Sequence, residues 1–214
     1  MNDTLNRIAE FKLIPMVVMD KVEYAVPFSD ALMAGGLPIA EITLRTSAAV
    51  HAIRALADRG DVLVGAGTVL SIEQADRAID AGAQFIVAPG TNPKVIEHVL
   101  KRGLPMVPGV VTPTEIELVL SLGVATLKFF PAEPMGGIAT LKALHGPYPD
   151  VRFIPTGGIT PELLPSYLKL SFVLACGGSW LAPRELLAAG RFDAIKFLIE
   201  QGAKILASPP EVAT

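Results

Sequence analysis

The chain has 214 residues, of which 51% are hydrophobic and 18% charged, and its formal net charge is −3. This length suits one sizeable core, and interspersed charges of both signs give no electrostatic case for binding nucleic acid or an anionic membrane. No apolar stretch approaches the roughly 18 residues of a membrane helix, the first residues lack a signal-peptide pattern, and the single cysteine, Cys176, fits a reducing cytoplasm. We therefore expect a cytoplasmic protein of one domain, without a nucleic-acid or membrane partner.

The predicted elements alternate regularly along the chain. Residues 1–10 are expected to form a short N-terminal helix, and residues 208–214 a flexible tail. Between them, short apolar runs rich in β-branched residues recur, and each one ends in Gly or Pro before a helical pattern begins. These runs predict strands at 13–18, 38–42, 62–66, 85–88, 105–107, 126–129, 152–155 and 172–176.

The segments between the predicted strands have the periodicity of amphipathic helices. In segments such as 51–59, 72–82 and 94–103, apolar residues recur three and four positions apart. Helix starts are marked at Ser71 and Thr112, each followed at capping-box spacing by Gln or Glu, and Thr160-Pro161 repeats the pattern of a cap followed by proline.

Eight strand–helix alternations indicate a parallel sheet, and strands this apolar are typical of a sheet covered on both faces. Closing eight such units predicts an α/β fold of the (β/α)8 TIM-barrel type, as a single domain over residues 1–214. A doubly wound open sheet is the alternative architecture.

A barrel of this kind carries its site at the carboxyl ends of the strands. The residues at these predicted ends are Glu41, Gly67, Thr68, Pro89, Gly90, Pro108, Gly109, Lys128, Thr156, Gly157, Gly158, Gly177, Gly178 and Ser179. The glycine turns after the seventh and eighth strands occupy positions where many barrels bind phosphate through backbone N–H groups. The alternative is that they are simple tight turns.

Lys128 lies inside an apolar run, and no acidic residue is closer in sequence than Glu133. A buried ammonium is costly, so a lysine here either extends to solvent or serves as an amine nucleophile whose neutral form burial favours. Lys12, at the start of the first strand, is expected to be solvated. Glu41 and Arg45 could also form a structural ion pair across a loop.

Seven motifs carry a family resemblance. They are EITLRT (41–46), GAGTVL (65–70), APGTNP (88–93), PGV (108–110), LKFFPAE (127–133), RFIPTGGIT (152–160) and GGSWLAP (177–183). Together, from about Ile14 to Pro183, they resemble the aldolases of 2-keto-3-deoxy-6-phosphogluconate (KDPG), a family that also handles 4-hydroxy-2-oxoglutarate (KHG).

The resemblance implies a class I aldolase, a lyase that forms a homotrimer of (β/α)8 barrels and needs neither metal nor other cofactor. By the same resemblance, Lys128 is the Schiff-base lysine and Glu41 the general acid/base, while Arg45 and Thr68 bind the pyruvyl group. Thr156 matches the position associated with selecting the configuration at C4.

The remaining site residues are assigned on the same grounds. Gly157-Gly158 and Gly177-Gly178-Ser179 match the phosphate end of the family's site. Pro89 follows the fourth strand, where the family often has Ser-Pro-Gly and this chain has Ala-Pro-Gly, and Phe130 adjoins the pocket.

The implied reaction is the reversible cleavage of KDPG to pyruvate and glyceraldehyde 3-phosphate. Cleavage of KHG to pyruvate and glyoxylate is the alternative, as the main or a side activity. Two other classes remain: a phosphate-binding synthase or isomerase in which Lys128 is an anion contact, and a metabolite-binding barrel without catalysis. Both predict no covalent adduct with pyruvate. The strand ends show no His/carboxylate cluster of the kind that a metal-dependent aldolase uses.

Overall fold

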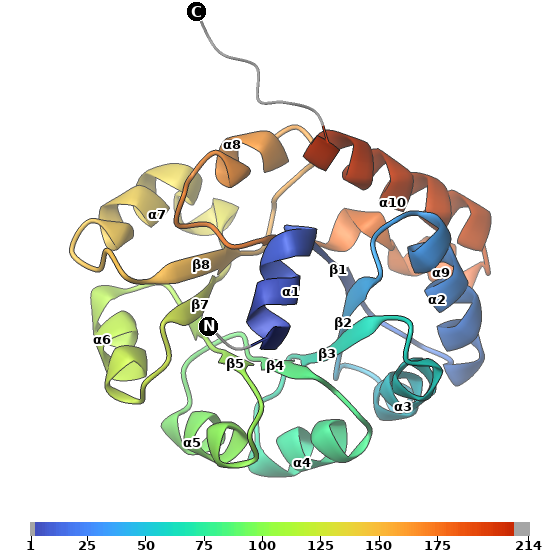
Figure 1. Ribbon diagram of the computed structural model, residues 1–214, viewed down its shortest axis with the longest axis horizontal. Coiled ribbons are helices and arrows are strands. Elements are labelled where there is room, and N and C mark those ends of the chain that lie inside the picture. The colour runs from blue at the N-terminus through green and yellow to red at the C-terminus, as the bar shows by residue number, and fades with distance from the viewer. Residues whose placement is uncertain (1–2, 208–214) are drawn as a thin grey trace, which may run out of the picture.

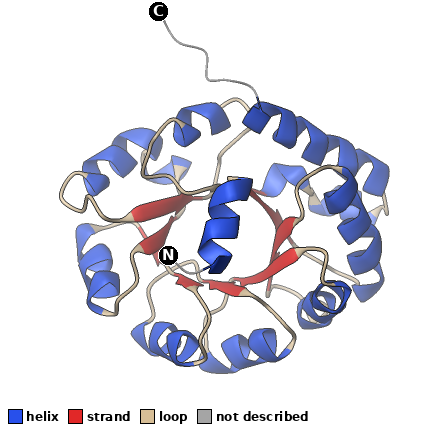
Figure 2. Ribbon diagram, viewed as in Figure 1, coloured by secondary structure: helices blue, strands red, loops and turns tan. Residues whose placement is uncertain are grey.

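The computed structural model describes residues 3–207, so the tail predicted at 208–214 lies outside the described residues. The strands form a closed ring with helices around it, as Figure 1 shows by chain order and Figure 2 by element type. The strands are β1 (Leu13–Val17), β2 (Ile39–Thr43), β3 (Leu63–Gly67), β4 (Phe85–Val87), β5 (Met106–Val107), β6 (Gly109–Val110), β7 (Thr126–Phe129), β8 (Arg152–Pro155) and β9 (Cys176–Gly178).

The longer helices cover the outside of this ring, and three short 3-10 turns lie in the connections. The helices are α1 (Asp3–Phe11), α2 (Ala25–Ala34), α3 (Ala49–Arg59), α4 (Ile72–Asp80), α5 (Pro93–Lys101), α6 (Pro113–Ser121), α7 (Gly137–His145), α8 (Leu164–Leu168), α9 (Arg184–Ala188) and α10 (Phe192–Ala207). The 3-10 turns are η1 (Val22–Tyr24), η2 (Glu133–Met135) and η3 (Ser179–Leu181). Within residues 3–207, no helix is long and apolar enough to cross a membrane.

All strand pairings in the ring are parallel, which confirms the predicted (β/α)8 barrel over the open sheet. One run of strands has the order β5-β4-β3-β2-β1-β9 and the other β6-β7-β8. Isolated parallel bridges between Phe153 and Val173, and between Thr156 and Gly177, join the second run to the end of the first. Every residue of β2 and β3 is buried, as expected for strands covered on both faces.

The fifth strand, predicted at 105–107, is present as β5, and a second short strand, β6, follows beyond its predicted end. Pro108 separates β5 from β6, because proline has no N–H to donate to a ladder. The Pro108 carbonyl still accepts the Lys128 N–H at 2.8 Å, so the chain stays in the barrel wall at this point. The break therefore changes the strand assignment and leaves the barrel closed.

The last strand lies further along the chain than predicted. The apolar run 172–176 was expected to be a strand, but β9 begins at Cys176. The partner strand explains the difference, because Leu13, Ile14 and Pro15 of β1 pair with Cys176, Gly177 and Gly178. Periodicity within one segment carries no information about this register.

The helix starts are confirmed at two of the three predicted positions. The Ser71 hydroxyl accepts the Gln74 N–H at 3.2 Å, and Thr112 forms a full capping box with Glu115. Thr160-Pro161 does not begin a helix; α8 starts at Leu164, whose N–H donates to the Thr160 carbonyl.

The predicted N-terminal helix is present as α1, which ends one residue before Lys12 and therefore lies at the amino ends of the strands. Figure 1 shows it crossing the opening of the ring. Its Ile8 is fully buried in the core. With this end covered, the carboxyl ends of the strands form the open face of the barrel.

Candidate active site

Lys128 and Glu41 meet inside the barrel at the positions predicted for the site. Lys128 extends from β7 and Glu41 from β2, and the Lys128 Nζ donates to Glu41 Oε1 at 3.3 Å. Their side chains are 5% and 4% exposed. Lys128 is therefore buried against an acidic partner and does not extend to solvent, while Lys12 is exposed as expected.

The expected alternative for Glu41, an ion pair with Arg45, is wrong. Glu41 pairs with Lys128, and Arg45 forms no ion pair among residues 3–207. Arg45 is exposed and lies two residues beyond β2, where its N–H donates to the Thr43 carbonyl at 2.8 Å. The Arg45 guanidinium therefore lies at the same end of the barrel as the buried pair, is exposed, and is able to bind an anionic group from solvent.

Gly67 makes the space that Glu41 occupies. It ends β3, which is the neighbour of β2, and a Cβ atom at Gly67 would lie 2.1 Å from Glu41 Oε1. Such a contact is far inside van der Waals range, so any side chain here would displace the carboxylate. The sequence placed Gly67 at a strand end but attached no role to it; its position in GAGT was the available signal.

Phe130 covers the other side of the amine. The Lys128 Nζ lies 5.3 Å from the centroid of the Phe130 ring, a cation–π distance. Phe130 is half-buried and directly follows the last residue of β7. The structure thus brings Phe130 next to Lys128, and its contact with a substrate stays a prediction.

Thr156 lies at the end of β8, next to the strand that carries Lys128. Its side chain is buried, and its N–H donates to the Phe129 carbonyl at 2.9 Å. A Cβ atom at Gly177 would lie 2.5 Å from the Thr156 hydroxyl oxygen, so the glycine of β9 leaves room for this threonine.

The first predicted glycine turn, Gly157-Gly158, follows β8, whereas the second is not a turn: Gly177 and Gly178 are part of β9, and Ser179 begins η3. Gly157 and Gly158 have φ angles of 102° and 82°, a region that side chains with a Cβ rarely adopt. Gly178 is buried and Ser179 is exposed. The Gly157-Gly158 turn and Ser179 therefore both follow the carboxyl ends of their strands, on the open face of the barrel.

Thr68 and Pro89 complete the predicted set. Thr68, directly after β3, has a φ of 58°, which is strained for a β-branched residue. Strain of this kind persists where the surrounding structure imposes it and concentrates at functional sites. Pro89 is half-buried, and its carbonyl lies so close to Gly109 that a Cβ there would be 2.1 Å away.

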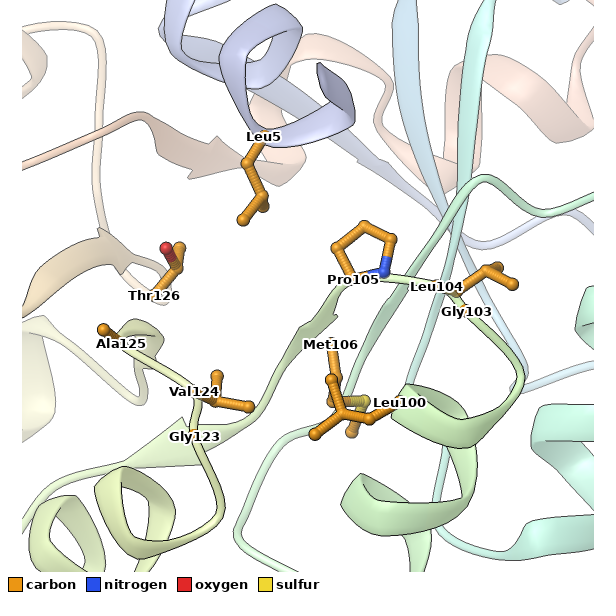
Figure 3. A pocket seen from close by; sticks show the side chains of 10 residues that line it. All are labelled: Leu5, Leu100, Gly103, Leu104, Pro105, Met106, Gly123, Val124, Ala125 and Thr126. Carbon is orange, nitrogen blue, oxygen red and sulfur yellow. The ribbon is translucent and has the colours of Figure 1, made fainter. Parts of the chain in front are cut away.

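The opposite end of the barrel has a cavity of a different character. A cavity of about 280 Å³ lies between α1 and the amino ends of β5 and β7, and Figure 3 shows the residues that line it, with Leu5 coming from α1. No charged side chain lines it. Nucleophilic and acid–base groups are thus gathered at the carboxyl ends. Within residues 3–207, no group of three or more His, Cys, Asp or Glu side chains could hold a metal ion.

Comparisons with known proteins agree on one family. The sequence model of the family "KDPG and KHG aldolase" matches residues 5–198. The chain is 48% identical over 196 residues to the 2-dehydro-3-deoxy-phosphogluconate aldolase of Treponema pallidum, covering 91% of this chain and 93% of that protein. It is 44% identical over 197 residues to the KHG/KDPG aldolase of Escherichia coli K12, covering 90% and 92%.

A solved structure matches equally well. The KDPG aldolase of Legionella pneumophila superposes with a TM-score of 0.89 at 37% identity, covering 93% of this chain and 97% of that one. That structure holds pyruvate captured at low pH as a covalent carbinolamine intermediate.

Proposed function

This chain belongs to the KDPG and KHG aldolase family, and from that premise we propose that it cleaves KDPG through a Schiff base on Lys128, with Glu41 as the general acid/base. It is a class I aldolase, an aldehyde-lyase that splits KDPG reversibly into pyruvate and glyceraldehyde 3-phosphate. The observation that carries the proposal for these two residues is their buried contact of 3.3 Å at the carboxyl ends of the strands.

The contact suits the first step of the reaction. An amine attacks a carbonyl when it is neutral, and a proton passed from the Lys128 Nζ to the Glu41 carboxylate produces that form without leaving an unpaired charge. The amine then adds to the C2 carbonyl of the substrate to give a carbinolamine. Loss of water, with a proton supplied by Glu41, gives the iminium.

The iminium makes the carbon–carbon bond breakable. Glu41, directly or through water, accepts the proton of the C4 hydroxyl, the C3–C4 bond breaks, and its electron pair moves to the iminium to form an enamine. Glyceraldehyde 3-phosphate leaves with the new carbonyl at C4. Glu41 returns the proton to C3, and hydrolysis of the resulting iminium frees pyruvate and restores the lysine.

The substrate's two ends are assigned to the two sides of this pair. Arg45 and Thr68, at the ends of β2 and β3, are proposed to bind the pyruvyl carboxylate, with Pro89 alongside. Thr156 is placed beside the C4 carbon. The Gly157-Gly158 turn and the Gly177-Gly178-Ser179 segment are proposed to hold the phosphate, because loops after the last two strands of a barrel present backbone N–H groups to anions.

Trapping the adduct tests the mechanism. Incubation with pyruvate followed by borohydride reduction should add one pyruvyl group, and mass spectrometry of peptides should locate it on Lys128. Exposed Lys12 serves as the internal control and should stay unmodified. Modification of Lys12, or the same labelling in a Lys128→Arg variant, would contradict the assignment. An absence of labelling would favour a phosphate-binding barrel without covalent chemistry.

KHG is the second candidate substrate, as a main or side activity. The support is the 44% identity to the E. coli protein, whose name gives both substrates. KHG shares the pyruvyl end with KDPG and has no phosphate. Comparing kcat/KM for the two substrates on one preparation decides between them.

We also propose that the chain acts as one domain and assembles as a homotrimer. Large apolar side chains are exposed on the packed helices α2 and α10, where Val26, Met33 and Phe197 are 46%, 45% and 58% exposed. An apolar surface of this kind is typical of a protein interface. Sedimentation equilibrium should give a mass about three times the 22.6 kDa of the chain. A mass of one chain would contradict the trimer.

A further inference from the structure

Glu133 is an acidic side chain close to the site that the proposed reaction does not use. It begins η2, five residues after Lys128, and its Oε1 accepts a hydrogen bond from the hydroxyl of Tyr167 on α8. Tyr167 is fully buried. Burial, and next the Glu133 carboxylate, raise the pKa of the Tyr167 hydroxyl above its ordinary value, so it stays protonated and donates.

Two glycines leave room for the Glu133 side chain, one beside its carboxylate and one beside its Cβ and Cγ atoms. A Cβ at Gly137 would lie 2.7 Å from Glu133 Oε1, and a Cβ at Gly158 would lie 2.7 Å from the Glu133 Cβ. Both glycines also have positive φ angles, of 57° and 82°. The Glu133 side chain therefore lies directly on the glycine turn that follows β8, and there is no free space between them.

The backbone joins the same two segments. The Ala132 N–H donates to the Thr156 carbonyl at 2.8 Å, and the Glu133 N–H donates to the Gly157 carbonyl at 3.0 Å. These bonds hold the loop after β7 to the loop after β8 at their first residues. Beyond Gly157, the Glu133 side chain lies nearest to Gly158, with Pro134 Cδ farther away, and Glu133 also reaches α8 through Tyr167.

We propose that Glu133 and Tyr167 are positioning residues, which fix the Gly157-Gly158 turn at the distance from Lys128 that the phosphate end of the substrate requires. Glycines with positive φ have many accessible backbone conformations, so such a turn needs outside contacts to stay in one of them. This inference rests on the proposed function, since it assumes a substrate that reaches from Lys128 to that turn.

Loss of the contact between Glu133 and Tyr167 should lower kcat/KM for KDPG, which carries a phosphate, and not for KHG, which has none. A turn that shifts by a fraction of an ångström loses its hydrogen bonds to a phosphate, whereas the reaction at C2 to C4 depends on Lys128 and Glu41. A purely structural role would instead weaken both substrates together, through a smaller fraction of folded enzyme. The ratio of kcat/KM for KDPG and KHG separates the two roles.

The experiment compares Tyr167→Phe and Glu133→Gln with the wild type. Tyr167→Phe keeps the buried ring and removes the hydroxyl; Glu133→Gln keeps the shape and one acceptor oxygen but removes the charge. We expect kcat/KM for KDPG to fall about 3- to 10-fold in Tyr167→Phe, the effect of one net hydrogen bond, and less in Glu133→Gln. For KHG it should stay within about twofold, and pyruvate labelling of Lys128 should be unchanged.

The chain offers a matched control. The Tyr148 hydroxyl donates to Glu117 Oε1 at 3.0 Å, the same chemical pair on the exposed surface and away from the turn. Tyr148→Phe should leave both substrates unaffected. Equal losses for KDPG and KHG in Tyr167→Phe, or no loss for either, would overturn the positioning role. Failure of the wild type to be labelled by pyruvate would instead refute the proposed function, which is a separate outcome.

Discussion

Lys128 and Glu41 depend on each other for their place in the barrel. Both are nearly inaccessible to solvent, and each is the other's charged partner at 3.3 Å. Removing one member of a buried pair leaves an uncompensated charge, which typically costs about 3–5 kcal/mol of stability. Truncation of either residue therefore confounds loss of chemistry with loss of fold, and conservative changes are the informative ones.

Glu41→Gln is the first such change. The amide keeps the volume of the side chain and can still accept from the Lys128 ammonium, but it cannot take up a proton. We expect kcat for cleavage to fall about 10²- to 10⁴-fold, the usual contribution of a general acid/base. Steady-state assay of pyruvate release measures this, with thermal unfolding as the check that the variant is folded. Wild-type turnover would show that Glu41 is merely the structural partner of Lys128.

Gly67→Ala tests whether the position of the Glu41 carboxylate matters, without changing Glu41 itself. The new methyl carbon would lie 2.1 Å from Glu41 Oε1, so the Glu41 carboxylate must move from its position beside Lys128. A displacement of about 1 Å at a reacting group can cost about 10²-fold in rate, and we expect a loss of that order in kcat.

The control for Gly67→Ala is Gly146→Ala at the end of α7. There a Cβ meets its nearest atom at 3.5 Å, an ordinary contact, so activity should be unchanged. Equal activity of the two variants would contradict the role assigned to Gly67.

At the level of elements, the site is made by the loops that follow the strands. The loops after β7 and β8 are joined by backbone hydrogen bonds at Ala132 and Glu133, and β8 is bridged to β9 at Thr156 and Gly177. Three consecutive strand ends thus form one connected unit around Lys128. A change in one of these loops is expected to affect the end of the substrate that it faces.

Ser179→Ala examines the loop after β9. Its hydroxyl is exposed on the open face, and its proposed partner is the substrate phosphate. Loss of a hydrogen bond to a charged group should weaken binding of the KDPG transition state by roughly 1–2 kcal/mol and lower kcat/KM accordingly. The value of kcat/KM for KHG should hardly change. Kinetics on both substrates measure this, with Ser166→Ala on α8, also exposed, as the control. Equal impairment of both substrates would refute the phosphate assignment and favour KHG.

At the level of the whole molecule, closing the barrel separates two ends with different tasks. α1 and the uncharged cavity beside it occupy the amino ends, while the buried ion pair and the Gly157-Gly158 turn occupy the carboxyl ends. The core between them is continuous and includes the single cysteine, Cys176, which is fully buried in β9.

Cys176 predicts how stability changes in alkali. Burial raises the pKa of the Cys176 thiol far above its ordinary value, so above pH ~8.5 the unfolded chain loses this proton and the folded chain keeps it. The folded state then binds more protons, and the free energy of unfolding must fall as pH rises, by up to about 1.4 kcal/mol per pH unit.

Denaturant unfolding at fixed protein concentration, in reducing buffer between pH 7 and pH 10, measures this slope. A Cys176→Ala variant should be less stable at pH 7 because of the lost contacts, but its stability should fall less steeply above pH ~8.5. Identical slopes in the two proteins would show that the thiol is not the group responsible.

The sequence by itself determined the fold class and the order of the elements, and it supplied the candidate site residues. Short continuous apolar runs, capping residues and glycine turns are local features, and they act through backbone preferences that neighbouring residues set. Those runs placed Lys128 and Glu41 near the carboxyl ends of two strands, and the structure has them inside β7 and β2. The roles proposed for them came from the resemblance of seven motifs.

The tertiary structure alone decided the partners. That Glu41 faces Lys128 and not Arg45, that β9 starts at Cys176, and that Gly67 makes room for a carboxylate all depend on register between strands far apart in sequence. The contact between Glu133 and Tyr167 is of the same kind, since it joins residues 34 positions apart. The pairing of strands around the closed ring sets these distances, and they cannot be inferred from the hydrophobic pattern of one segment.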